Sequence, residues 1–222
     1  TQRAGRVTEE DIKKHIKDKL TSGTVKKETQ KKYKDEYDHA EFGKVEVKDI
    51  PRVKRLSGPQ LVRSWTEIPH VTQHDEIDIT EMEIFRKSLR DVFTGEKIAI
   101  TPLAFITRAL VNALKTYPNF NSSIDTESNK ITYKKYFHIG FAVDTPHGLM
   151  VPKIRNVETM GIKKISDELR KVSKLCRELK IDKKEFFGGS MTISSLGGIG
   201  GNFFTPIINP PEVAILGVGK AF

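Results

Sequence analysis

The segment from Ser194 to Asn202 joins two adjacent hydroxyl groups to four glycines within five positions. Glycines let the backbone approach a ligand closely, and a hydroxyl at the end of the preceding strand faces that approach. The segment lacks the lysine of a phosphate-binding loop and no helix pattern follows it, which argues against nucleotide binding. Ser194 is therefore a candidate to face a bound ligand, with Gly197 and Gly198 as candidate substrate-binding positions. A purely structural turn is the alternative, which the local sequence leaves open.

The histidines offer weaker candidates. His70 and His74 have a spacing that suits a metal on a helix, but their context predicts a strand, where four residues span roughly 13 Å. We therefore expect no metal site there, and His138 and His147 have no visible partner. Asp144 follows a predicted strand and precedes Thr145-Pro146, so it either supports a site or only stabilises the turn.

Composition narrows the function classes. The charge is +9, but more than half of that excess lies in the first 55 residues, where basic and acidic residues alternate with few aromatic ones. This pattern favours a solvated tether over a nucleic-acid-binding arm. No stretch reaches the roughly 18 apolar residues of a membrane span, and no signal peptide is expected. The single cysteine, Cys176, is expected to be a buried apolar residue in a reducing compartment.

The elements that must position these residues alternate between helix and strand. Helices are predicted over Leu56–Trp65, from the apparent capping box Thr80-x-x-Glu83, from Thr101-Pro102 through Leu114, over Ile162–Leu179, and briefly from Asp182. Strands are predicted over 69–79, 131–136, 137–143, 149–154, 191–195 and 213–218, with a turn at Thr145–Gly148. This mixed order predicts an α/β two-layer sandwich with a mixed sheet rather than a doubly wound parallel sheet.

The N-terminal part has a different composition. Thr8 can cap a helix that carries Ile12, Ile16 and Leu20 at helical spacing. From Thr21 onwards charge is dense and apolar residues are sparse, which predicts a linker or extended arm over residues 21–45. The main domain is therefore predicted to begin near Glu46.

Six runs of residues, in order along the chain, resemble the 2-oxo acid dehydrogenase acyltransferase family. They are Ile68-Pro69-His70-Val71-Thr72, Asp78-Ile79-Thr80-Glu81, Phe120-Asn121-Ser122-Ser123, His138–Pro146, Thr192-Ile193-Ser194-Ser195-Leu196-Gly197 and Pro211–Val218. The Pro-His-Val-Thr version is most similar to the acetyltransferases of pyruvate dehydrogenase. Residues 5–11 resemble the back half of the small peripheral-subunit-binding domain, so residues 1–20 are expected to be a remnant of it.

The resemblance implies a fold like that of chloramphenicol acetyltransferase, with trimers that assemble into a 24-mer or 60-mer core. It implies coenzyme A as a substrate, a lipoyl group carried by a separate domain of the same protein, and no metal. It also implies the 2-oxo acid dehydrogenase and dihydrolipoamide dehydrogenase components as partners, with no role for nucleic acid or membrane. The expected location is the bacterial cytoplasm, with the mitochondrial matrix as the alternative.

The family mechanism assigns roles to residues. A histidine in a His-x-x-x-Asp-Gly motif takes the thiol proton, and the serine matching Ser194 stabilises the oxyanion. Asp144 matches a supporting polar residue, and Ser195 should matter less because its side chain points to the opposite face of a strand. No His-x-x-x-Asp-Gly motif occurs in the 222 residues. The catalytic domain is therefore expected to lack its C-terminal part, and a catalytically inactive scaffold fragment is the alternative to an active enzyme.

Overall fold

The computed structural model describes Lys13 and residues 37–221. The chain divides into two units, Thr1–Lys48 and Asp49–Phe222. In the described part of the first unit, the 3₁₀ helix η1 (His39–Glu41) is capped by the Asp38 carboxylate, which accepts a hydrogen bond from the Ala40 amide at 3.0 Å. The helix predicted from Thr8, apart from Lys13, and residues 21–36 lie outside the described residues, so the assignment of segments 1–20 and 21–45 stays a prediction.

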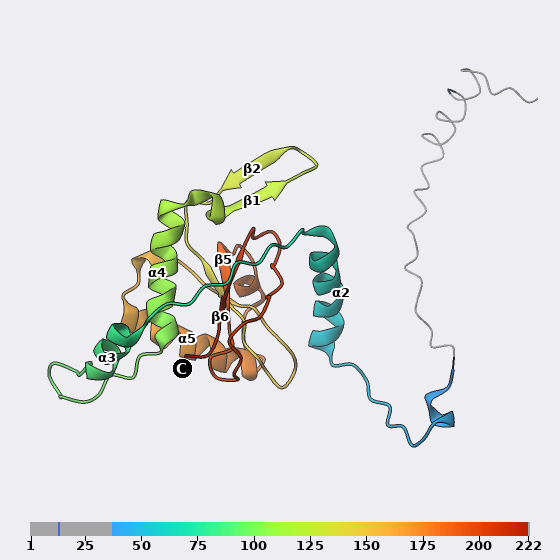
Figure 1. Ribbon diagram of the computed structural model, residues 1–222, viewed down its shortest axis with the longest axis horizontal. Helices are drawn as coiled ribbons and strands as arrows, with labels where there is room; N and C mark the ends of the chain where they lie inside the picture. The colour runs from blue at the N-terminus through green and yellow to red at the C-terminus, as the bar shows by residue number, and fades with distance from the viewer. Residues whose placement is uncertain (1–12, 14–36, 222) are drawn as a thin grey trace, which may run out of the picture. The chain divides into compact units, whose positions relative to one another are not determined.

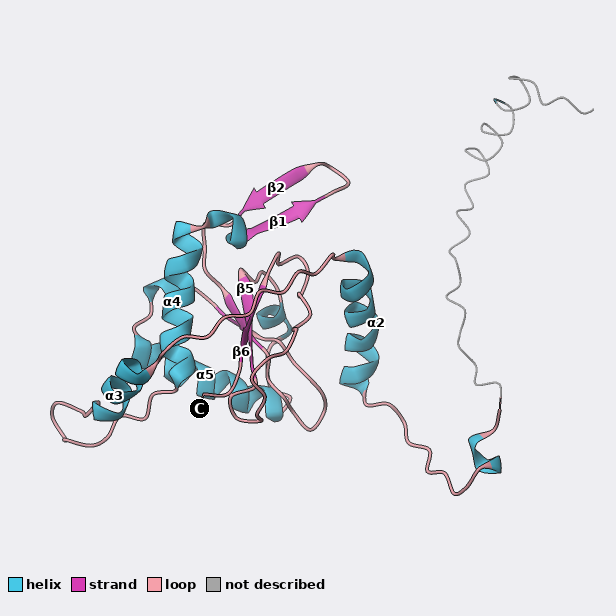
Figure 2. Cartoon of the chain, in the orientation of Figure 1, coloured by secondary structure: helices cyan, strands magenta, loops and turns pink. Residues whose placement is uncertain are grey.

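The second unit combines four α-helices, short 3₁₀ helices and two sheets (Figures 1 and 2). The α-helices are α2 (Arg52–Glu67), α3 (Thr80–Ser88), α4 (Pro102–Thr116) and α5 (Ile162–Arg177), and the 3₁₀ helices are η2 (Pro118–Asn121), η3 (Val157–Thr159) and η4 (Lys183–Phe186). The strands are β1 (Ser122–Asp125), β2 (Lys130–Tyr133), β3 (Ile139–Phe141), β4 (Lys153–Ile154), β5 (Met191–Ser195) and β6 (Ile215–Val218).

The main sheet has the order β4-β3-β5-β6. β3 pairs with β4 in antiparallel fashion and with β5 in parallel fashion, and β5 and β6 are parallel. β1 and β2 form a separate antiparallel pair. The sheet is therefore mixed, as predicted, and the carboxyl ends of β3, β5 and β6 meet at one edge.

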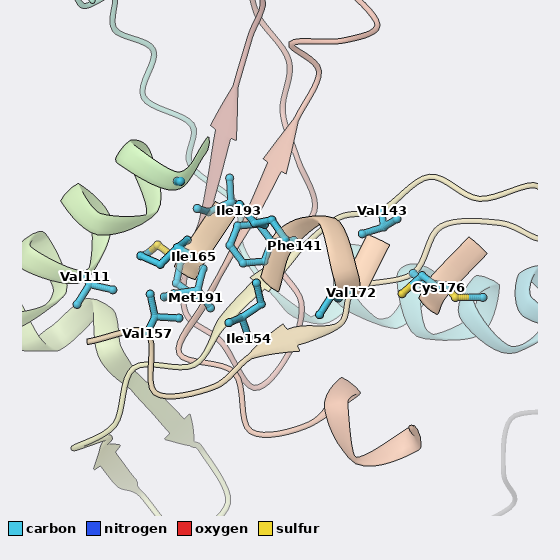
Figure 3. Close-up of a cluster of buried hydrophobic side chains, with 14 of the residues drawn as sticks. Val111, Phe141, Val143, Ile154, Val157, Ile165, Val172, Cys176, Met191 and Ile193 are labelled. Atoms are coloured by element: carbon cyan, nitrogen blue, oxygen red, sulfur yellow. The ribbon is translucent and has the colours of Figure 1, made fainter. Parts of the chain in front are cut away.

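The core lies between the main sheet and the helices. α4 and α5 are amphipathic, because their apolar residues recur at helical spacing, and they contribute Val111, Ile165 and Leu169 to the buried cluster. Figure 3 shows Ile165 beside Phe141 and Ile193 of the sheet. Side chains alternate along a strand, so the residues between these core positions point to the opposite face of the sheet.

Two predictions about residues 69–83 are wrong. Residues 69–79 form no strand, because no described strand lies beside them to complete a ladder; Val71 and Ile77 are 96% and 77% exposed. Thr80 does begin a helix, but there is no capping box, since the Asp78 carboxylate accepts the Thr80 amide at 2.8 Å and Glu83 instead pairs with Arg86.

The other elements predicted after residue 55 are confirmed with shifted ends, and β1 was missed. The Thr145–Gly148 turn joins two strand segments that continue toward it through a bridge between Val143 and Met150. β1 escaped prediction because its sequence, Ser-Ser-Ile-Asp, has only one apolar residue and lacks the alternation of a half-buried strand.

Candidate functional site

Ser194 lies near the carboxyl end of β5, on the face of the sheet opposite the core that α4 and α5 cover. Met191 and Ile193 face the core, so Thr192 and Ser194 face the other way. Ser194 is half-buried and pairs in register with Gly217 of β6. The ring of Phe204 packs over Gly217, where an added Cβ would lie 3.1 Å from Phe204 Cζ. Within the described residues the Ser194 hydroxyl has no hydrogen-bond partner, so it is available to donate.

Ser195 lies on the other face and has different surroundings. It lines an open cavity of about 310 Å³ on the helix side of the sheet, together with Ile193 and Arg170. Its Oγ accepts a hydrogen bond from the Gly197 amide at 3.3 Å. The two neighbouring serines therefore have different environments, as the strand alternation predicts.

The glycine-rich loop after β5 turns back tightly on itself. The amides of Ile199 and Gly200 both donate to the Leu196 carbonyl, at 2.9 and 2.8 Å. Gly200 and Gly201 have φ values of 120° and 96°, which L side chains rarely adopt.

The two glycines predicted to bind substrate lie at the exposed start of this loop. An added Cβ at Gly198 would have no heavy atom within 4 Å, and at Gly197 the nearest would be 3.5 Å away. The backbone at Gly197 and Gly198 is thus accessible, three and four positions after Ser194, and no described side chain covers it.

Asp144 lies at the same edge of the sheet as Ser194, because it follows β3, the parallel neighbour of β5. It is exposed and makes no hydrogen bond or ion pair within the described residues. Instead Thr145, which is buried, holds the turn: its hydroxyl donates to the Gly148 carbonyl at 2.6 Å and accepts the His147 amide at 3.2 Å. A turn-stabilising role for Asp144 therefore has no support in the structure.

His70 and His138 make hydrogen bonds with the backbone. His70 accepts the Ile208 amide at Nε2 (3.0 Å) and lies 2.7 Å from the Ile68 carbonyl through Nδ1, so the hydrogen bonds assign its proton to Nδ1. His138 Nδ1 accepts the Asn156 amide, and burial lowers the pKa of this ring. Among the residues that the structure describes, no group of three or more His, Cys, Asp or Glu side chains is placed to hold a metal ion.

A buried charged cluster next to Ser194 was missed by the sequence analysis. Lys153 Nζ of β4 lies 2.5 Å from Glu212 Oε1 and 3.1 Å from Thr192 Oγ1, and the Thr192 hydroxyl donates to Glu212 Oε2 at 2.6 Å. All three side chains are buried. The sequence signal that could have found this cluster was a lysine inside the apolar segment 149–154. A lysine buried with that segment needs a charged partner, since buried charges in proteins are paired.

Two glycines make room for this cluster. An added Cβ at Gly140 would lie 2.5 Å from Lys153 Nζ, and one at Gly189 would collide with Glu212 Oε1. Lys134 is nearby and half-buried; its ammonium donates to the Gly189 carbonyl at 2.8 Å. Burial lowers the pKa of Lys134, the charge of Lys153 lowers it further, and the charge of Glu212 opposes both effects.

Solved structures define the fold class. The dihydrolipoamide acetyltransferase of Azotobacter vinelandii, studied for the roles of a serine, a histidine and an asparagine in catalysis, matches with a TM-score of 0.80 and 43% identity, covering 84% of this chain and 76% of that one. A truncated catalytic core of the 2-oxoacid dehydrogenase multienzyme complex from Thermoplasma acidophilum matches with a TM-score of 0.71 and 34% identity, covering 79% and 80%. The predicted two-layer, chloramphenicol acetyltransferase-like fold is confirmed.

The family follows from the sequence comparison. The model of the 2-oxoacid dehydrogenases acyltransferase (catalytic domain) matches residues 42–222, and the chain belongs to this family. The dihydrolipoyllysine-residue acetyltransferase component of the pyruvate dehydrogenase complex of Cupriavidus necator is 44% identical over 98% of this chain and 41% of that protein. The component of the same name in Haemophilus influenzae is 43% identical over 100% and 42%. The chain thus spans about two fifths of the length of these relatives.

Proposed function

We propose that the chain serves in acetyl transfer between dihydrolipoamide and coenzyme A, in the core of a pyruvate dehydrogenase complex. The observation that carries this proposal is the family match over residues 42–222, together with relatives at 43–44% identity that are acetyltransferase components of that complex. Both thiols are substrates in this reaction. The lipoyl group belongs to a separate domain of the protein, and no metal takes part.

The proposed chemistry is thioester exchange. The family's motif histidine takes the proton of the incoming thiol, and the thiolate sulfur attacks the carbonyl carbon of the other thioester. The carbonyl oxygen becomes an oxyanion, which receives a hydrogen bond from the Ser194 hydroxyl. When the intermediate collapses, the second sulfur leaves as a thiolate and is protonated. The free hydroxyl of Ser194 and the accessible backbone at Gly197 and Gly198 support this role, and Asp144 is retained as a supporting polar residue.

The test compares Ser194→Ala with Ser195→Ala in the full-length gene product, since the 222 residues contain no His-x-x-x-Asp-Gly motif. We expect Ser194→Ala to lower kcat by about 100-fold or more with little change in KM, because an oxyanion donor acts in the transition state. Ser195→Ala is the matched control and should retain most of the activity. Normal turnover in Ser194→Ala would refute the role of this serine, and loss in Ser195→Ala alone would show that the wrong serine was assigned.

We also propose that the domain assembles into trimers that build a larger core, with the dehydrogenase components bound elsewhere on the full protein. A solved structure with 43% identity is the cubic core of a pyruvate dehydrogenase multienzyme complex. Several large apolar side chains lie exposed in the second unit, which supports burial against further copies: Trp65, Val71, Ile77, Phe93 and Ile199. Light scattering that shows only monomers of the full-length protein would contradict this assembly.

In the described part of the chain, no helix is long and apolar enough to cross a membrane.

A further inference from the structure

The buried cluster beside Ser194 lies in one row across the main sheet. Lys153 of β4 pairs in register with Gly140 of β3, and Gly140 pairs with Thr192 of β5. Residues paired in this way point to the same face of the sheet. Because Gly140 has no side chain, the lysine chain passes over β3 and its ammonium reaches Thr192 on the next strand. Any larger residue at position 140 would occupy the path of the lysine.

The same row is tied to the chain segment that leads into β6. Glu212 precedes that strand by three residues, and its two carboxylate oxygens contact different partners, Lys153 at 2.5 Å and Thr192 at 2.6 Å. The cluster therefore fixes β4, β5 and the entry to β6 together. Its charges are fully buried, so both must stay paired to be tolerated in the interior.

Thr192 stands two residues before Ser194, and the two side chains share a face of β5. In the next row of the sheet, Ser194 is paired with Gly217 of β6. The cluster therefore lies on the same face of the sheet as Ser194, at the position on β5 two residues before it. It ties β5, the strand that carries Ser194, to β4 and to the segment that leads into β6. Within the described residues, the Ser194 hydroxyl makes no hydrogen bond that would orient it.

We propose that Lys153 and Glu212 are positioning residues for Ser194, acting through Thr192 to hold the serine hydroxyl where the thioester oxyanion forms. The proposal rests on the proposed role of Ser194. Neither charged group is exposed to substrate, so their effect passes through the geometry of β5. A donor displaced by a fraction of an ångström loses much of its value in the transition state while substrate binding changes little.

The test is a double-mutant cycle in the full-length protein. Thr192→Val removes the hydroxyl that joins the ion pair to β5 and keeps the side-chain shape. We expect kcat to fall by about 10-fold or more with KM within about twofold, because misplacement of a catalytic group mainly affects the transition state. Thr192→Ser, which keeps the hydroxyl, should restore most of kcat. In the Ser194→Ala background, Thr192→Val should have no further effect, since the group it positions is gone.

A second variant covers the case in which Thr192→Val does not fold. Lys153→Met combined with Glu212→Gln removes both charges at nearly constant volume, so neither is left buried without a partner. It should show the same dependence on Ser194. Glu185→Gln is the control. It weakens the 3.0 Å ion pair with Arg155, a residue whose hydrogen bonds go to Glu185 and to the Lys184 and Phe187 carbonyls, and it should leave kcat unchanged.

The outcomes separate this inference from the proposed function. An equal loss of kcat with and without Ser194 would overturn the positioning role and leave the function standing, since a structural defect acts in both backgrounds. Unchanged kcat in Thr192→Val would also overturn it. If Ser194→Ala alone had no effect, the proposed role of the serine would fall first and this inference with it.

Discussion

Gly140→Ala is predicted to destabilise the domain strongly, because the missing side chain is where the buried lysine passes. The added Cβ would lie 2.5 Å from Lys153 Nζ and 2.6 Å from Thr192 Oγ1. To reach ordinary van der Waals contact, the ammonium must retreat by roughly 1 Å. That movement can lengthen its 2.5 Å contact with Glu212 to about 3.5 Å, which weakens the hydrogen bond, and Thr192, in the middle of the sheet, has little room to yield.

The size of the effect can be estimated from its parts. Overpacking a buried position costs about 1–3 kcal/mol, and weakening a buried ion pair adds to that cost. The loss of flexibility in the unfolded chain offsets about 0.4–1 kcal/mol. A net loss of about 2–4 kcal/mol should lower Tm by roughly 5–15 °C for a domain of this size.

The measurement is thermal unfolding followed by circular dichroism, with Gly198→Ala as the matched control. At Gly198 the added methyl group meets no atom within 4 Å, and that change should stay within about 0.5 kcal/mol of the original stability. If Gly140→Ala and Gly198→Ala unfold at the same temperature, the Lys153 side chain does not need the space above Gly140. The contacts of Lys153 with Thr192 and Glu212 would then not be those described above.

Two further predictions concern the same strands. Thr145→Val should cost about 1–3 kcal/mol in urea unfolding, because it removes two hydrogen bonds of a buried hydroxyl, whereas Asp144→Asn should have almost no effect; the reverse order would place the turn's support on the aspartate. Burial lowers the pKa of His138 below its usual value, so the folded state favours the neutral ring. This contribution to stability is therefore present above pH about 6.5 and lost as the pH falls below it, and replacing His138 by Gln should flatten the pH dependence of the urea midpoint in that range.

Elements specified by local pattern could be predicted from the sequence. α4 and α5 have apolar residues at helical spacing, and a turn sequence separates the two apolar segments that form β3 and β4, so each is encoded within a short stretch. The opposite orientation of Ser194 and Ser195 followed from strand alternation alone. Residues 69–79 show the limit of such patterns: alternation describes a pleated surface, but a strand also needs a neighbour, and no described segment provides one.

The buried cluster could not be predicted for a different reason. Lys153 and Glu212 are 59 positions apart, and although Lys153 stands in an apolar segment, neither segment indicates which residue it pairs with. The register of β4, β3 and β5 brings Lys153 to Thr192, with Gly140 leaving the space between them, and the segment before β6 brings Glu212 to both. A glycine inside a strand usually weakens the strand and often marks a close approach of another group. The sequence alone does not identify that group, which in β3 is the side chain of Lys153.

The buried Lys153–Glu212 ion pair is better explained by the geometry that it fixes than by the stability that it adds. An apolar replacement of similar volume often stabilises a protein as well as a buried pair does, so stability alone does not require Lys153 and Glu212. Directional hydrogen bonds, however, fix the separation of β4, β5 and the entry to β6 more tightly than apolar contacts between flexible side chains. Within the described residues the Ser194 hydroxyl has no hydrogen-bond partner, so its position depends on its strand. A rigid polar row directly before it is therefore a physical means of orienting a hydroxyl that must stay free for the oxyanion.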